Sequence, residues 1–231
     1  MIIHSKELLY AKQCKYDVDE VIFESSTAGT YSLEFLEDGA YEIIAVGGGG
    51  GAAAYATGSI SYTIALTGGG GSGAMYQGQF YIPKSTVEIV VGSRGNSSTT
   101  ALTSLSVWTS SATAGGQSKV GSYLTVGGGG AGSASLQANN PSYSGGTAGT
   151  VSSVSSSSLT TTISQSSGST GTAVRTTYGD RDSTVTASAT TSAYQPYGTG
   201  SGVAATTRMS SAATITHSYG SAGYIKIKFI K

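Results

Sequence analysis

The sequence is poor in charge, and its basic residues are scattered along the chain without forming a basic stripe. Only 10% of its 231 residues are charged, against roughly a quarter in an average domain, and the formal net charge is zero. A nucleic-acid-binding protein needs a basic surface, and a membrane-bound segment needs a polybasic patch. We therefore expect neither nucleic acid nor membrane insertion.

Cysteine and targeting signals are also scarce. Cys14 is the only cysteine, so no disulfide can form within the chain. The opening residues, MIIHSKELLY, have a short apolar run followed by charges, which is not the pattern of a signal peptide. No stretch approaches the length of a membrane span. These features predict synthesis in a cytoplasm, with release by lysis or as part of a particle.

Side chains that usually carry chemistry are few and far apart. The soft metal ligands are His4, Cys14 and His217, and no pair of them is close in sequence. Asp180 and Asp182 could flank a calcium ion, but a solvated turn is the favoured interpretation. No nucleophile elbow is present, and no spacing supports a catalytic pair of His217 with Asp180. We therefore predict no enzyme, with no catalytic residue, metal or cofactor.

Glycine, in contrast, is abundant and occurs in runs. There are 35 glycines, and the long runs are Gly47–Gly51, Gly68–Gly71 and Gly127–Gly130. Three interpretations are open: a flexible linker, a phosphate-binding loop, or an extended helix of the polyproline II type. The apolar stretches that flank the runs are unusual beside a linker. In the third interpretation the helices have three residues per turn and bond laterally to one another.

The remaining pattern indicates β-structure. Gly29–Leu36 alternates apolar and polar residues, Ala40–Val46 is apolar, and Glu37-Asp38-Gly39 between them predicts a hairpin turn. Gly223–Ile230 alternates as well and predicts a closing strand that returns to the core beside this hairpin. The predicted fold class is all-β: a β-sandwich-like layer with glycine-rich, polyglycine II-type segments and long Ser/Thr-rich loops.

Composition divides the chain into two parts. Residues 1–21 form a predicted N-terminal docking arm, in which Glu7–Lys15 contains good helix formers. Residues 22–231 form a glycine-rich β domain that ends in the closing strand at 223–231. Within it, 133–215 is rich in Ser and Thr. This region is compatible with variable loops, a second thin β layer or a low-complexity linker.

Aromatic residues surrounded by Gly, Ser, Thr and Asn are a further feature. Such a mixture resembles a binding surface in which tyrosine supplies rigid contact area, although the same rings could fill a thin core. The aromatic faces also suit sugar rings. The candidate receptor-binding residues are Tyr55, Tyr62, Trp108, Tyr143, Tyr178, Tyr194 and Tyr197; Tyr219 has a similar setting.

Several of these segments together resemble a known family. They are the strands Gly29–Phe35 and Tyr41–Val46, the latter running into Gly47–Gly51, then STVEIVVGSRG, the run Val126–Gly132 and the closing Gly223–Ile230. The pattern resembles the glycine-rich domains of phage tail-fibre adhesins and tail tip proteins. The resemblance implies a β layer with glycine helices, and variable loops at a host-binding tip. The loops would be 52–67, 93–118 and 133–210.

On this basis we expect a virion protein that recognises a bacterial surface glycan or protein through its loops. The N-terminal arm would bind other virion proteins. A homo-oligomer is expected because a thin core gains from burying more surface between chains, and a trimer is one arrangement. The alternative is a structural virion component, such as a capsid-decorating or fibre-shaft protein without a receptor. An ice-binding protein ranks lower because no regular Thr-x-Thr ladder is present.

Overall fold

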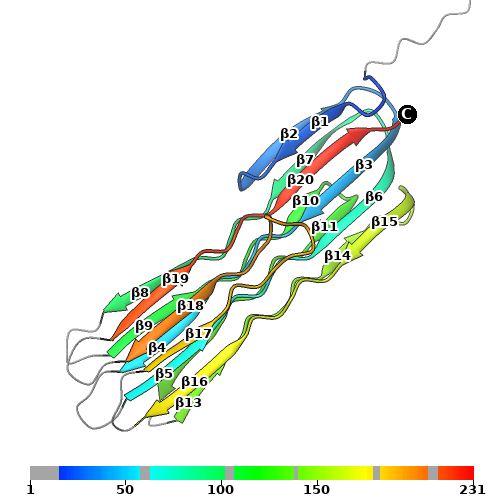
Figure 1. The fold of residues 1–231 in the computed structure, drawn as a ribbon. Helices are drawn as coiled ribbons and strands as arrows, with labels where there is room; N and C mark the ends of the chain where they lie inside the picture. Colours follow the sequence, from blue (N-terminus) through cyan, green and yellow to red (C-terminus); the bar gives the residue numbers. More distant parts are fainter. Residues whose placement is uncertain (1–15, 58–62, 102–106, 138–139, 179–182, 208–212) are drawn as a thin grey trace, which may run out of the picture.

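The computed structural model describes residues 16–57, 63–101, 107–137, 140–178, 183–207 and 213–231. These residues form twenty β-strands and, within the described ranges, no helix. The molecule is elongated, with a group of sheets at each end and a middle region of extended chain (Figure 1). The all-β prediction is therefore confirmed. We name the three parts the proximal sandwich, the glycine layer and the distal sheets.

The proximal sandwich consists of two five-stranded antiparallel sheets. The first contains, in spatial order, β1 (Val21–Ser25), β20 (Tyr224–Phe229), β3 (Gly39–Val46), β6 (Met75–Ile82) and β15 (Leu159–Ser166). The second contains β14 (Val151–Val154), β11 (Leu124–Val126), β10 (Ser118–Val120), β7 (Ser85–Val91) and β2 (Gly29–Phe35). The closing strand is confirmed, because β20 lies between β1 and β3.

Aromatic and aliphatic side chains from both sheets fill this sandwich. Phe35 and Tyr41 are fully buried, and their rings meet edge to face with centroids 4.8 Å apart. Phe229 packs on Tyr41 in turn, at 5.3 Å. Alternation along each strand places such residues inward, as expected for a sheet with one buried face. The proximal sandwich is thus the main hydrophobic core of the molecule.

The predicted hairpin at Glu37-Asp38-Gly39 is wrong. β2 pairs with β7 and β3 pairs with β6, so the chain passes from one sheet to the other between Phe35 and Gly39. Both strands have an apolar face, and the two faces meet across the core instead of lying side by side. Gly39 has no positive φ; its missing side chain makes room for the ring of Phe229, which would lie 2.7 Å from a Cβ.

Two buried phenols in this part of the molecule predict a loss of stability in alkali. Tyr41 donates to the carbonyl of Glu37 at 2.7 Å, and Tyr224 donates to Oε1 of Glu24 at 2.6 Å. Burial, with the nearby carboxylates, raises the pKa of both far above the usual value of about 10. The folded state therefore keeps protons that the unfolded state releases. We expect the free energy of unfolding to fall above about pH 10, by up to about 1.4 kcal/mol per pH unit for each tyrosine.

Urea denaturation at a series of alkaline pH values measures this slope. The double variant Tyr41→Phe/Tyr224→Phe should show a shallower decline than the wild type, while Tyr81→Phe, at a residue 51% exposed, should not. An unchanged slope in the double variant would contradict the explanation.

The distal sheets contain the other ten strands. A five-stranded sheet has the order β16 (Ala173–Tyr178), β5 (Thr63–Gly68), β4 (Ala53–Thr57), β9 (Val107–Ala112) and β8 (Ser97–Ala101). A three-stranded sheet contains β17 (Ser183–Ala187), β18 (Gly202–Thr207) and β19 (Thr214–Ser218), and β12 (Ser133–Gln137) pairs with β13 (Asn140–Ser144). Strands thus make up much of 133–210, but they are divided among five sheets and do not form a single second layer. The predicted loops 52–67 and 93–118 are also partly strand, since β4, β5, β8 and β9 occupy parts of them.

Small side chains bring these sheets close together. On one face of the five-stranded sheet, Ala54, Ala56 and Ala65 pack against Val185 and Ala205 of the three-stranded sheet. On its other face, Tyr55, Ile64 and Leu66 pack against Ala134 and Leu136 of β12. The five-stranded sheet is thus the middle of three layers. Alanine fills most of one interface, so this core is thin.

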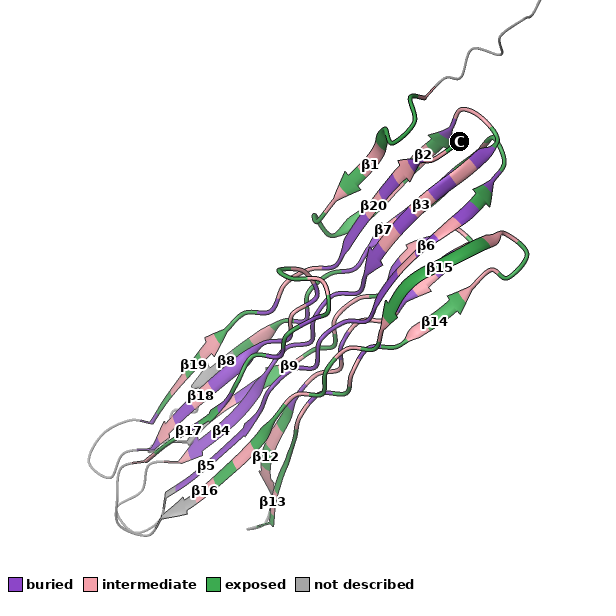
Figure 2. Cartoon of the chain, turned by 45° about the vertical axis from the view of Figure 1, so that its right-hand side comes forward, coloured by how far each residue is buried: buried purple, intermediate pink, exposed green. Residues whose placement is uncertain are grey.

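The glycine layer is formed by the connections between the two ends. Eight of them cross from one end to the other as extended segments, which we call rods. A ninth connection, 188–201, reaches the proximal sandwich and turns back. Figure 2 shows that buried residues continue from the proximal strands through the rods into the distal strands. The crossing rods are 47–52, 69–74, 92–96, 113–117, 127–132, 145–150, 167–172 and 219–223.

Hydrogen bonding in the central rod repeats every three residues. Successive N–H groups of Gly47–Gly51 point to three different neighbours, and the fourth returns to the first neighbour. The N–H groups of Gly47 and Gly50 donate to rod 69–74, those of Gly48 and Gly51 to rod 113–117, and that of Gly49 to rod 219–223. A three-residue period with lateral bonds is that of the polyproline II type of helix. The third interpretation of the glycine runs is therefore correct.

The carbonyl groups of the same rod bond to three further neighbours. Gly49 accepts from Gly95, Gly50 accepts from Ser201, and Gly48 and Gly51 accept from Gly129 and Gly132. The rod is thus surrounded by six chain segments. Their backbones lie so close to it that no side chain fits between them. A Cβ at Gly49 would lie 1.8 Å from the carbonyl oxygen of Thr199, and one at Gly70 would lie 2.0 Å from that of Gly50.

Rods at the outside of the layer need glycine only at every third residue. Their inward positions lie against the backbone of a neighbouring rod, and a Cβ there would come within 2.5 Å of it. Most of the other positions carry Ser, Thr, Ala or larger residues; Gly145 is an exception, because a Cβ there would lie 1.7 Å from the carbonyl oxygen of Gly171. The pairs are Gly92 and Gly95, Gly146 and Gly149, Gly168 and Gly171, and Gly220 and Gly223.

Buried hydroxyls complete the bonding where a rod meets a strand or turn. The Oγ of Ser118 donates to the carbonyl of Val46 at 2.6 Å and accepts from the N–H of Gly92 at 2.9 Å. Thr190 does the same between Gly70 and Gly200. Both side chains are almost fully buried. Buried polar groups need such partners, so these hydroxyls replace backbone atoms that the irregular segments cannot supply.

Candidate functional site

Both ends of the described chain lie at the proximal end of the molecule. The ring of Tyr16 packs 5.5 Å from that of Phe229, and the N–H of Asp19 donates to the carbonyl of Phe229 at 2.9 Å. The carbonyl of Lys231 accepts from Ala40. Tyr16, the first residue that the structure describes, and Lys231 therefore both lie at this end.

The opposite end is formed by the ends of distal strands. Every internal range outside the described residues is flanked by two distal strands, whose ends lie together at this tip (Figure 1). The sequences of these ranges differ in chemistry: GSISY, LTSLS, AN, GDRD and RMSSA. They belong to ranges 58–62, 102–106, 138–139, 179–182 and 208–212.

Two of the seven predicted receptor-binding residues have their backbone near this tip. Trp108 on β9 pairs with Ala56 and Ala101, and Tyr178 on β16 pairs with Thr63. Their backbones thus lie next to strand ends at the tip. Tyr62 lies outside the described residues.

Tyr143 is on the surface as predicted. It lies on β13 opposite Ala134, and its side chain is 38% exposed.

Tyr55 is a core residue, contrary to the prediction. Only 8% of it is exposed, and it packs with Ile64 and Leu66 beneath β12. Burial raises the pKa of its phenol. Side chains alternate along β4, so Ala54 and Ala56 face the three-stranded sheet and Tyr55 between them faces β12.

Tyr194 and Tyr197 lie away from the distal end. They belong to the turn of connection 188–201 and stack on Tyr224 of β20, with ring centroids 5.5 Å and 4.3 Å away from that of Tyr224. Val46 and Met75 complete the cluster. The stack holds the turn against the proximal sandwich, so these half-buried rings have a packing role that the sequence did not reveal.

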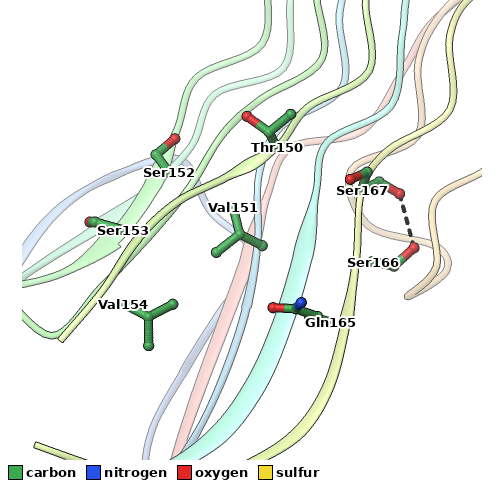
Figure 3. Close-up of a pocket in the computed structure, with 8 residues that line it drawn as sticks. All are labelled: Thr150, Val151, Ser152, Ser153, Val154, Gln165, Ser166 and Ser167. Atoms are coloured by element: carbon green, nitrogen blue, oxygen red, sulfur yellow. Dashed lines mark hydrogen bonds between the residues drawn. The ribbon is translucent and has the colours of Figure 1, made fainter. Parts of the chain in front are cut away.

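Two large hollows lie on the surface of the described structure, and sequence reasoning missed both. One is a groove of about 570 Å³ between the edge strands β14 and β15 (Figure 3). It is lined by Thr150–Val154 and by Gln165–Ser167, so most of its side chains are hydroxyls. The other, of about 620 Å³, lies on the flank of the glycine layer, where rods 92–96, 113–117 and 219–223 meet the turn at Ala28.

Clusters of metal-binding side chains are absent from the residues that the structure describes. No three His, Cys, Asp or Glu residues within them could share an ion, and they include no apolar helix long enough to span a bilayer. His217 is on β19 opposite Val203, and burial lowers the pKa of its imidazole. The run Gly47–Gly51 is enclosed by other rods and cannot cradle a phosphate.

Comparison with known proteins gives no further identification. No model of a known protein family matches the chain, and no curated protein is significantly similar to it.

Proposed function

We propose that the protein is a non-enzymatic tail-fibre or receptor-binding protein of a virion, which recognises a glycan or protein on a bacterial surface through its distal end. The observation that carries this proposal is the separation of roles along the molecule. Tyr16 and Lys231 lie at one end, and the strand ends that flank all five internal undescribed ranges lie at the other. Between them is a layer whose backbone bonding leaves little freedom.

In this proposal each part has one task. The N-terminal residues 1–21 bind other virion proteins, and several copies assemble side by side, with a trimer as one arrangement. The glycine layer holds the distal sheets at a fixed distance from the particle. The five short ranges between distal strands differ from one another in sequence. Connecting segments tolerate substitutions, so their sequences can vary while the glycine layer stays the same.

The alternative is a structural virion component without a receptor. One observation favours it: the edge strands β14 and β15 contain no charged residue and no proline, and such edges suit lateral packing against other copies. The two functions differ in what the purified protein binds, since a structural component would bind particles and not cells.

Binding to intact bacteria tests the proposal. Fluorescently labelled full-length protein is incubated with a panel of bacterial strains, and the bound fraction is measured by flow cytometry. Replacing 58–62 and 208–212 together by Gly-Ser segments of equal length should reduce binding at least tenfold, because the strands that flank these ranges end at the distal tip. The melting temperature should be retained, because the core lies elsewhere.

Tyr81→Ala is the matched control, since Tyr81 is 51% exposed on the proximal sandwich. It should bind cells like the wild type. Binding that survives the distal replacement, or that is lost equally in Tyr81→Ala, would contradict a receptor site at the distal end.

A further inference from the structure

The flank of the glycine layer brings together an exposed cation and an exposed aromatic ring. The guanidinium carbon of Arg94 lies 5.0 Å from the ring centroid of Tyr219, and Tyr219 is 63% exposed. The two residues come from rods that are adjacent in space, because the N–H of Gly223 donates to the carbonyl of Gly92 at 2.8 Å.

The backbone around this pair is fixed by inward-facing glycines. A Cβ at Gly95 would lie 2.1 Å from the carbonyl oxygen of Thr113, and one at Gly220 would lie 2.3 Å from that of Thr199. Arg94 directly precedes Gly95, and Tyr219 directly precedes Gly220. The backbone that carries both side chains is therefore held in place by the close packing of these glycines. Such preorganisation lowers the entropy lost when a ligand binds.

Arg94 has no carboxylate to neutralise it within the described part of the chain. The ion pairs found there join Lys119, Lys226 and Lys228 to acids of the proximal sandwich. Between residues 89 and 223 the sequence has five basic residues and only two acids, Asp180 and Asp182. The side chain of Arg94 contacts the face of Tyr219, which leaves the N–H groups at its edge directed to solvent.

The groove that Arg94 lines has the dimensions and polarity of a ligand site, and Tyr219 lies next to its lining residue Gly220. Its volume of about 620 Å³ falls within the usual range for small-molecule pockets, and its lining includes the exposed side chains of Ser93 and Asn96. An arginine fork matches the paired oxygens of a carboxylate or phosphate. The ring of Tyr219 offers an apolar face to the C–H side of a sugar. The side-chain amide of Asn96 and the hydroxyl of Ser93 can form hydrogen bonds with the hydroxyl groups of that sugar.

We infer that this groove binds an anionic sugar, namely a sugar ring that bears a carboxylate or a phosphate. Arg94 holds the anionic group, Tyr219 packs on the ring, and Asn96 bonds a ring hydroxyl. The site is on the flank of the molecule and shares no residue with the distal end. Its existence is therefore independent of whether the distal segments bind a receptor.

Amide chemical-shift titration of the ¹⁵N-labelled full chain tests this inference. The probes are glucuronic acid, glucose 6-phosphate, glucose and inorganic phosphate. Both acidic sugars should shift the amides of rods 92–96 and 219–223, glucose should shift them at least tenfold more weakly, and phosphate alone should also bind more weakly than glucose 6-phosphate.

Arg94→Ala and Tyr219→Ala should each weaken binding of glucuronic acid about tenfold, since a charge-assisted bond or a ring contact is lost. Both residues are exposed, so the remaining amide spectrum should keep its folded dispersion. Lys84→Ala is the control for net charge, because Lys84 is an exposed cation on the proximal sandwich. Equal binding of glucose, equal binding of phosphate alone, or unchanged affinity in Arg94→Ala would overturn the inference.

Discussion

Replacing Gly50 by alanine should destabilise the protein by about 3 kcal/mol or more, enough to prevent folding of a marginally stable chain. The new Cβ would lie 1.9 Å from the carbonyl oxygen of Gly130 and 2.6 Å from its carbon. Neither neighbour is a side chain that can rotate away. Gly50 also bonds to rod 69–74 through its N–H and to Ser201 through its carbonyl, so a shift that relieves the overlap would break both contacts.

Chemical denaturation of the purified variant measures this effect, and loss of soluble protein is the extreme outcome. Gly29→Ala is the matched control. A Cβ at Gly29 would meet nothing closer than 3.7 Å, and that contact is with the ring of Tyr31. This variant should be as stable as the wild type, or slightly more stable because the unfolded chain loses freedom. A Gly50→Ala protein that melts like Gly29→Ala would refute the close packing of the rods.

Phe35→Ala should cost about 3–5 kcal/mol in the free energy of unfolding. Phe35 is fully buried, and its ring packs edge to face against Tyr41 at the point where the chain passes between the two proximal sheets. Removing the ring leaves a cavity and ends an aromatic contact that contributes beyond area burial. Unfolding in urea, followed by tyrosine fluorescence, measures the loss.

A graded pair of variants separates packing from other causes. Phe35→Leu should lose less stability than Phe35→Ala because it refills part of the cavity. Tyr81→Ala removes a ring of similar size that is half exposed, so its effect should be small. Equal losses in Phe35→Ala and Tyr81→Ala would mean that the sandwich core does not determine stability.

Local patterns were enough to predict the strands that begin and end the proximal sandwich, and they included the observed conformation of the glycine runs among three interpretations. Alternation in Gly29–Leu36 and Gly223–Ile230 reflects burial of one sheet face, which is a property of each segment by itself. The run Gly47–Gly51 implied close backbone packing because no other residue allows it. The pairing of strands was not predictable in the same way. β2 and β3 are adjacent in sequence, yet β2 pairs with β7 and β3 pairs with β6, both of which lie much further along the chain.

The rods within the Ser/Thr-rich region 133–215 were not predicted because they contain no long run of glycines. Gly146 and Gly149, and likewise Gly168 and Gly171, are three residues apart, and each pair marks one rod at the outside of the layer. The number of neighbours around a rod decides how many of its residues must be glycine. A search for glycine at every third position would have found these rods, whereas Tyr55 could not be recognised as buried without knowing which sheet covers it.

The arrangement of the rods also determines how the molecule responds to a pull between its two ends. Each rod runs along the long axis (Figure 1), whereas its hydrogen bonds point sideways to other rods. A polyproline II-type segment already rises about 3.1 Å per residue, close to the roughly 3.3–3.6 Å of a fully stretched chain. Tension is therefore borne by eight segments of the chain that run side by side and are almost fully extended. The hydrogen bonds between these segments are loaded in shear all together and do not open one by one. Such a layer is an inextensible link, able to transmit force from one end of the protein to the other without lengthening.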